Sequence, residues 1–466
     1  MPGDRGRERL LSSRDDFARL KHARLGIGAP PSRRGVPKKT RSLGLVAAFL
    51  TTVLVVFGTT SCGSSSGPVE ITFWSWVPGI QKEVQLFEKS HPDIDVKYVN
   101  AGQGADQYTK LRTALKAGEG VPDVVQIEFQ YIPSFTQIDA LADISEYGAN
   151  EVKDDYVDWT WSQVSEGDKV YAIPQDSGPM ALLYRKDIFD EHNLKVPKTW
   201  DEFAQEAQKL HQADPDTYMT NFAANDPGWV TGLLWQAGAR PFDVNGKNVS
   251  INLDDPASMQ VAEYWQGLIE DEVVSTDPDF TNDWYAGLGK GKYATWISAA
   301  WGPVFLTGVA GESKGKWRAA PLPQWNEGED VTANWGGSTS AVTAESQYPE
   351  EATEFAIWLN HNEESTDMLA KESSLFPTLE SKLNSPEFKN ASYPFYGGQK
   401  VNQVFIEASE NVDKGFEWSP FQDYVYAEMG EKIDDAASGK STFPEALEAV
   451  QSSTESYAKK QGFKVE

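Results

Sequence analysis

Residues that bind metals or form cross-links are scarce in this chain of 466 residues, which has one cysteine and five histidines. A single cysteine cannot form an intramolecular disulfide. The histidines never stand at the spacing of zinc ligands, and the glycine-rich stretches lack the full order of a phosphate loop or a nucleophile elbow. We therefore expect no metal site, no cofactor and no disulfide framework.

Basic residues are also in the minority, with 42 Lys and Arg against 69 Asp and Glu. The first 61 residues hold 12 of the basic and 4 of the acidic residues, so they carry about +8 and the remainder about −35. Nucleic-acid binding needs a basic surface, which this remainder lacks. No nucleic-acid partner is expected, and the charge suits a soluble domain held outside the cell.

Only one long apolar run occurs, from Leu43 to Phe57. It is shorter than the roughly 18 residues of a membrane span and follows the basic segment 32–42, which is typical of a signal peptide over residues 1–61. Cys62 comes directly after it and resembles the lipidated cysteine of bacterial lipoproteins. We expect a lipid anchor at Cys62 and a tether over 62–68 at the extracellular face of the membrane. The alternative is ordinary cleavage nearby with a free thiol.

The remaining 405 residues are enough for two lobes. The stretch "VEITFWSW" predicts a buried strand, residues 80–90 show helical spacing, and "IDVKYVN" alternates as a second strand. A strand, a helix and a strand in this order indicate an α/β lobe with a mostly parallel sheet. Capping signals before the helices expected from 199 and from 255 indicate a second lobe, rich in helices and tryptophan.

Polar and aromatic residues gather near the ends of the expected elements, where ligands bind in open α/β sheets. Indole rings can cover the apolar faces of a sugar, and carboxylates and amides can serve its hydroxyls. Trp74, on the same strand face as Trp76 but farther from its end, is expected in the core. For each tryptophan the alternative is a core position, and for Glu128 and Asp176 a solvated surface position. The candidate ligand-binding residues are Trp76, Glu128, Gln130, Asp176, Trp229, Trp301, Trp335, Gly336 and Gly337.

Several segments, among them "IPQDSGPMALLYRKD", "VPKTWDEF" and "NWGGSTSAV", resemble the extracellular sugar-binding proteins of bacterial ABC importers, the group that includes maltose-binding protein. The resemblance implies a two-lobed periplasmic-binding-protein type II fold whose hinge has three crossings, near 175, 320 and 375. It implies lobe 1 over 69–175 and 321–375, and lobe 2 over 176–320 and 376–466. It also implies a monomer that holds a sugar between the lobes and delivers it to a membrane permease by hinge closure.

Two other functions remain open from the residues alone. One is a secreted glycoside hydrolase that uses Glu128 and Asp176 as its pair of carboxylates. The other is a carbohydrate-binding adhesin at the cell surface. Capture of a sugar without chemistry is the leading hypothesis, because neither rival explains the three expected crossings as simply.

Overall fold

The computed structural model describes residues 67–466, which belong to one compact unit. The expected signal peptide, Cys62 and most of the expected tether lie outside the described residues. Across residues 67–466, no helix combines the length and the apolar character needed to cross a membrane. The described chain is organised around two separate clusters of buried side chains, here called the first core and the second core.

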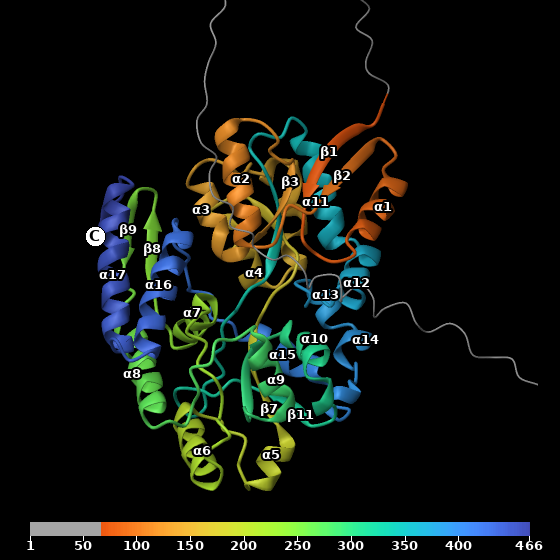
Figure 1. Cartoon of the computed structure of the whole chain (residues 1–466). Coiled ribbons are helices and arrows are strands. Elements are labelled where there is room, and N and C mark those ends of the chain that lie inside the picture. The colour runs from red at the N-terminus through yellow and green to blue at the C-terminus, as the bar shows by residue number, and fades with distance from the viewer. Residues whose placement is uncertain (1–66) are drawn as a thin grey trace, which may run out of the picture. The chain divides into compact units, whose positions relative to one another are not determined.

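The first core surrounds a five-stranded sheet with the strand order β2-β1-β3-β12-β6 (Figure 1). β1 pairs in parallel with β2 and β3, which confirms the strand and helix alternation expected from the sequence. β12 runs antiparallel to both β3 and β6, so the sheet is mixed. The elements of this half are β1 (Val69–Trp74), α1 (Gln81–Ser90), β2 (Ile94–Val99), α2 (Ala105–Ala117), β3 (Val124–Glu128), η2 (Phe129–Tyr131), α3 (Ile132–Thr136), η3 (Ser145–Tyr147), η4 (Ala149–Asp155), α4 (Asp158–Ser162), β4 (Ser165–Glu166), β5 (Lys169–Val170), β6 (Ala172–Pro174), β12 (Ser338–Val342), α11 (Pro349–His361) and α12 (Glu363–Lys371).

Aromatic side chains join the helices of this half to its sheet. The ring of Phe355 on α11 lies 5.1 Å from Phe73 of β1 and 5.0 Å from Phe87 of α1, both in edge contacts. All three side chains are fully buried. This packing fixes β1, and therefore the direction in which the chain leaves it.

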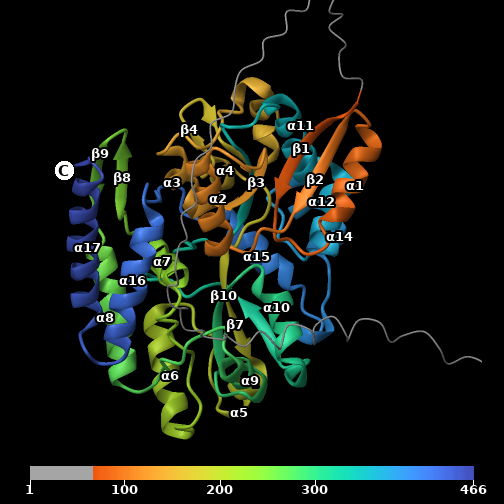
Figure 2. The ribbon, with the colours of Figure 1, turned by 45° about the horizontal axis from the view of Figure 1, so that its top comes forward.

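The second core is richer in helices and in tryptophan, as expected. Its central sheet is antiparallel with the order β10-β7-β11, and β8, β9 and β13 form a smaller sheet beside α17 (Figure 2). The fully buried tryptophans are Trp159, Trp200, Trp229, Trp235, Trp265, Trp284 and Trp317. The elements of this half are β7 (Met180–Arg185), α5 (Lys186–Glu191), α6 (Trp200–Ala213), α7 (Pro227–Gln236), β8 (Phe242–Asn245), β9 (Asn248–Ile251), α8 (Pro256–Glu270), α9 (Asn282–Lys290), β10 (Thr295–Ala299), α10 (Gly302–Val309), η5 (Gly311–Ser313), β11 (Trp317–Ala320), α13 (Glu380–Leu383), α14 (Pro386–Lys389), η6 (Pro394–Tyr396), α15 (Val401–Glu410), α16 (Gln422–Ala437), α17 (Phe443–Lys460) and β13 (Lys464–Val465).

The predicted helix starts at Thr199 and Asp255 are confirmed. Thr199 accepts a hydrogen bond from the backbone N–H of Glu202 at 3.1 Å, and Asp255 accepts one from Ser258 at 2.7 Å. Each satisfies a donor that the first helical turn leaves free. The capping box expected at Thr199 is incomplete, because the Glu202 carboxylate accepts from the backbone of Lys198 instead.

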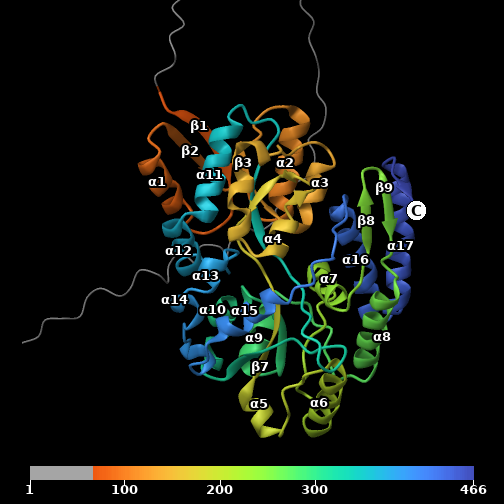
Figure 3. The same cartoon turned by 180° about the vertical axis from the view of Figure 1, so that it is seen from behind.

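The chain passes between the two cores three times. The first passage lies over 175–179, between β6 and β7. The last lies over 376–383, where the chain descends from α12 toward α14 and Leu379 is still buried in the first core (Figure 3). The second passage lies at Gly336 and Gly337, so the crossing expected near 320 was wrong. The prolines after β11 end a strand, but the following segment stays on the second core, where Leu322 and Ala333 are buried.

One side chain of the first half is buried in the core of the second half. Trp159 belongs to α4, in the sequence of the first half, yet it is buried in the second core. Its indole N–H donates to the backbone oxygen of Ser409 at 3.1 Å. Its ring lies 6.0 Å from Phe129 of the first core and 6.4 Å from Trp235 of the second. Trp159 therefore joins the halves by side-chain packing, apart from the three passages.

Candidate functional site

Glu128 ends β3, and Tyr108 of α2 holds its carboxylate in place. The Tyr108 hydroxyl donates to Glu128 Oε2 at 3.0 Å and accepts from the backbone N–H of Glu128 at 3.0 Å. Burial raises the pKa of Glu128 to about 7, and the negative charges of Asp176 and Asp226 add to the rise. Glu128 itself is half-buried, whereas the predicted ligand residue Gln130 is 7 % exposed. A hydrogen bond from Gln130 favours the ionised form of Glu128, and direct contact of Gln130 with a ligand stays a prediction.

A row of aromatic rings leads from Glu128 to the second core. The Trp76 and Tyr108 centroids are 6.1 Å apart, and Tyr108 lies 4.5 Å from Tyr131. Tyr131 in turn lies 6.2 Å from Tyr426, which belongs to α16 of the second core. Trp76, Tyr131 and Tyr426 are half-buried. Each of them keeps surface free for a ligand at the boundary between the cores.

Trp74 and Trp76 differ less than the sequence predicted. β1 ends at Trp74, so Trp76 stands two residues beyond the strand, held by a 3.0 Å hydrogen bond from its backbone N–H to Gln126 Oε1. Both tryptophans are half-buried and pack on the first core, while Ile71 and Phe73 on the opposite face are fully buried. The expectation that Trp74 is a core residue was wrong, because the core side of β1 is the face of Phe73.

Trp301 and Trp335 contact each other on the side of the second core. The indole N–H of Trp301 donates to the backbone oxygen of Trp335 at 3.0 Å, and the ring centroids are 4.6 Å apart. Trp301 is half-buried, but only 6 % of Trp335 is exposed. Gly336 has a φ of +80°, and a β-carbon there would lie 3.3 Å from Trp301 Nε1. A glycine is therefore required for this close approach.

Asp226 is a carboxylate at this boundary that sequence reasoning missed. It caps α7, where its Oδ1 accepts from the backbone N–H of Trp229 at 2.9 Å. Asp226 is half-buried next to the indole of Trp335, and burial raises its pKa. The stretch "NDPGW" contains a clear cap signal, but it was interpreted only for its tryptophan.

Trp229 was a wrong prediction as a ligand contact. It is 2 % exposed, and its indole N–H donates to the backbone oxygen of Ile297 at 3.1 Å. Its ring packs edge-on against Phe222 and Trp265 in the second core. The turn before Trp229 directs the Asp226 carboxylate outward and the indole inward.

Asp176 and Gly337 hold the first two passages against each other. Asp176 Oδ1 accepts from the backbone N–H of Ser338 at 2.9 Å. A β-carbon on Gly337 would lie 2.9 Å from the backbone oxygen of Asp176, so only glycine fits. Asp176 is 6 % exposed, which excludes the solvated alternative, and burial raises its pKa to about 6. Direct contact of Asp176 or Gly337 with a ligand stays a prediction.

Together these residues present hydrogen-bond acceptors beside aromatic faces. Ionised carboxylates only accept, so they match a ligand with many hydroxyl donors. Arg112, the cation nearest to Tyr131, is paired with Asp423. Within residues 67–466 there is no group of three or more His, Cys, Asp or Glu that could hold a metal ion. The sequence missed Tyr426 because an isolated tyrosine inside a helical pattern carries no signal for which face it occupies.

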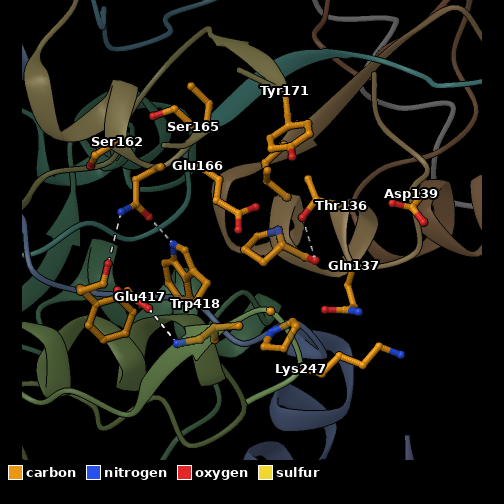
Figure 4. A pocket seen from close by; sticks show the side chains of 18 residues that line it. Thr136, Gln137, Asp139, Ser162, Ser165, Glu166, Tyr171, Lys247, Glu417 and Trp418 are labelled. Carbon is orange, nitrogen blue, oxygen red and sulfur yellow. Dashed lines mark hydrogen bonds between the residues drawn. The ribbon is translucent and has the colours of Figure 1, made fainter. Parts of the chain in front are cut away.

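A cavity of about 670 Å³, separate from the residues described above, lies between the first half and the β8–β9 hairpin (Figure 4). Pro133 of α3 and Gln137, directly after this helix, line one side, and Lys247 and Trp418 line the other. Trp418 donates to the Gln163 side chain, so polar groups here are already engaged with each other. This cavity does not include Glu128 or Asp226.

Comparison with known proteins identifies the class. Residues 74–365 match the family of bacterial extracellular solute-binding proteins, and the chain belongs to this family. It is 25% identical over 394 residues to the arabinooligosaccharide-binding protein of Bacillus subtilis (strain 168), covering 81% of this chain and 89% of that one. It is 28% identical over 369 residues to the lactose-binding protein of Rhizobium radiobacter, covering 74% and 83% of the two chains.

This chain is also similar to a solved structure of a binding protein. That protein is the ABC transporter associated binding protein from B. animalis subsp. lactis Bl-04 in complex with β-1,6-galactobiose. The identity is 32%, the TM-score is 0.75, and the match covers 86% of this chain and 100% of that one. The expected two-lobed α/β fold is therefore confirmed, and the two cores correspond to its lobes.

Proposed function

We propose that this chain binds a neutral sugar or short oligosaccharide between its two cores and delivers it to the membrane permease of an ABC transporter. The observation that carries the proposal is the mixture of half-buried groups at that boundary. Glu128 and Asp226 offer acceptors, while Trp76, Tyr131, Tyr426 and Trp301 offer ring faces. A sugar has apolar faces and a rim of hydroxyls, so it matches this mixture.

The comparisons support the ligand class. The two relatives and the solved neighbour are named for, or contain, neutral di- or oligosaccharides. They differ among themselves in the sugar, so the ligand of this chain is proposed only as a class. An extracellular location follows from the family.

The proposed mechanism is closure of the two lobes over the sugar. A ligand that contacts both lobes favours the closed state, because it binds that state more tightly than the open one. Contacts that already join the lobes at α16, such as that of Tyr131 with Tyr426, suit an interface that forms on closure. The permease would then recognise the closed form.

We further propose that the protein is not an enzyme. In a hydrolase, Glu128 and Asp176 would have to flank one glycosidic bond. Asp176 is instead buried and bonded to Ser338. Incubation with oligosaccharides that releases reducing ends would contradict this proposal. An adhesin is disfavoured because the half-buried groups face each other from two lobes instead of lying on one open surface.

The anchor and the oligomeric state are proposals as well. Cys62 follows an apolar run directly, and we propose that it carries the lipid that holds a monomer at the membrane. One acyl chain binds a membrane only weakly, so stable attachment needs more than one. Mass spectrometry of membrane-extracted protein should find a lipid-modified Cys62 at the N-terminus. An unmodified Cys62, or another terminus, would remove the anchor but not the binding function.

The decisive experiment is a thermal-shift screen of the purified soluble domain against lactose, β-1,6-galactobiose, maltotriose and arabinotriose. A ligand that binds only the native state raises the melting temperature. The expected result is a concentration-dependent rise with at least one of these sugars and none with glucose 6-phosphate, whose charge the carboxylates repel. No rise with any neutral sugar at millimolar concentration would overturn the proposed ligand class.

A further inference from the structure

Asp279 and Phe280, in the loop before α9, have an unusual local structure. Phe280 has a φ of +55°, in the left-handed region that bulky side chains avoid. Its ring is 37 % exposed. Yet it lies 6.1 Å from both Trp301 and Trp335, the pair next to Gly336 at the second passage between the lobes. An exposed ring on a strained backbone therefore adjoins the proposed site.

The side chain of Asn225 holds this loop. Asn225 Nδ2 donates to Asp279 Oδ1 at 2.8 Å, and the backbone N–H of Asp279 donates to Asn225 Oδ1 at 3.1 Å. This reciprocal pair joins the loop to the residue before Asp226, the cap of α7. The two carboxylates are close enough that the charge of Asp226 disfavours ionisation of Asp279.

The second oxygen of Asp279 has no partner. The residue is 3 % exposed, and Oδ2 is buried without any hydrogen bond among the described residues. A buried acceptor that lacks a donor destabilises the folded state. A ligand hydroxyl is the kind of donor that would satisfy Oδ2, and the next residue, Phe280, packs against the aromatic pair.

We infer that Asp279 and Phe280 form the sugar subsite of the second lobe, in which the Phe280 ring covers one face of a sugar and Asp279 Oδ2 accepts one of its hydroxyls. This inference rests on the proposed function. Since Oδ2 is shielded from solvent, the hydroxyl reaches it together with a movement of the loop that carries Asp279 and Phe280. This movement would release the backbone strain of Phe280, whose φ lies in the left-handed region.

The proposed subsite also predicts which sugars the protein binds and which it rejects. A deoxy sugar that lacks this hydroxyl leaves the buried Oδ2 of Asp279 without a donor, so it binds poorly. The subsite therefore requires a free hydroxyl at one position of the sugar, and it rejects a ligand with a negative charge there. Asp226 and Asp279 together repel such a charge.

The first test replaces Asp279 by Asn, which keeps an oxygen for Asn225 but removes the charge. We use calorimetric titration with the sugar that gives the largest thermal shift in the screen above. Asp279→Asn should weaken binding about tenfold or more. The melting temperature of the free protein should stay level or rise, because a buried charge beside Asp226 is removed. A purely structural role for Asp279 would lower that temperature and leave the affinity of the folded protein unchanged.

The second test addresses the ring. Phe280→Leu keeps apolar bulk but loses the aromatic face, and it should weaken binding about tenfold. Phe280→Tyr should restore the affinity. Tyr348→Leu is the matched control, since Tyr348 is an aromatic residue of similar exposure, 41 %, beside α11 of the first lobe. It should leave the affinity unchanged.

Monodeoxy analogues of the same sugar give the most specific readout. On the native protein, one deoxy analogue should bind more weakly than the parent sugar. On the Asp279→Asn variant, this analogue and the parent sugar should bind equally well. If the native protein binds its sugar and Asp279→Asn and Phe280→Leu bind it equally well, the subsite is wrong and the proposed function stands. If no sugar stabilises the native protein, the proposed function and the subsite fall together.

Discussion

The guanidinium of Arg112 on α2 forms an ion pair with the carboxylate of Asp423 at the start of α16, and this pair joins the two lobes. Arg112 also donates to Ser134 and lies 4.4 Å over the ring of Phe135. It is thus fixed on the first lobe and reaches across to the second.

Removal of this ion pair should change lobe closure more than stability. The two side chains are 34 % and 44 % exposed, and pairs so exposed contribute at most about 1 kcal/mol. Asp423→Asn should leave the melting temperature within a few degrees of the native value. The radius of gyration of the free protein in X-ray scattering should increase, because a contact that joins the lobes is lost. Lys432→Gln, which breaks a pair within α16, should change neither quantity.

Substitution of Trp335 and of Trp301 should have different effects on stability and on sugar binding, although the two rings are in contact. Trp335→Ala should destabilise the fold by about 3 to 5 kcal/mol, since the side chain is almost fully buried. Trp301→Ala leaves a half-buried site and should cost less stability while it weakens sugar binding by about 1 to 3 kcal/mol. Urea unfolding and calorimetric titration measure the two effects separately.

Glu128 should make the stability of the free protein depend on pH. Its pKa rises from an ordinary value of 4.5 to about 7 in the folded chain. Between these values the folded state binds more protons than the unfolded state, so stability falls as pH rises from about 4.5 to about 7. Glu128→Gln cannot ionise, so its melting temperature should fall less than that of the native protein from pH 5 to pH 8. Equal slopes for the two proteins would contradict the raised pKa.

Gly337→Ala should disrupt the second passage between the lobes. Its φ is +91°, and an added β-carbon would lie 2.8 Å from Phe129 and 2.9 Å from the backbone oxygen of Asp176. Gly439→Ala is the control, since Gly439 has a φ of +76° but open space around it. Both substitutions strain the backbone, so the difference between their melting temperatures measures the clash. We expect Gly337→Ala to be the more destabilising by several degrees.

The sequence predicted the parts of the site that follow from strand ends and missed those that depend on packing between the lobes. Glu128 stands at the end of a short apolar strand, and the end of the apolar run identifies its position. Tyr426 and Asp279 come from a helix and a loop whose neighbours are far away in the chain. Trp229 was misplaced for a related reason: a turn predicts where the backbone reverses, and only the surrounding core decides which side chain points inward.

The position of Trp159 bears on how the protein unfolds. A lobe that contributes a fully buried tryptophan to the core of the other lobe cannot separate from it without exposing that indole to water. The lobes should therefore lose their structure in one cooperative transition in scanning calorimetry, in spite of having two cores. We expect closure to be a rotation that leaves α4 in contact with the second lobe, with its axis close to Trp159 and Ser409.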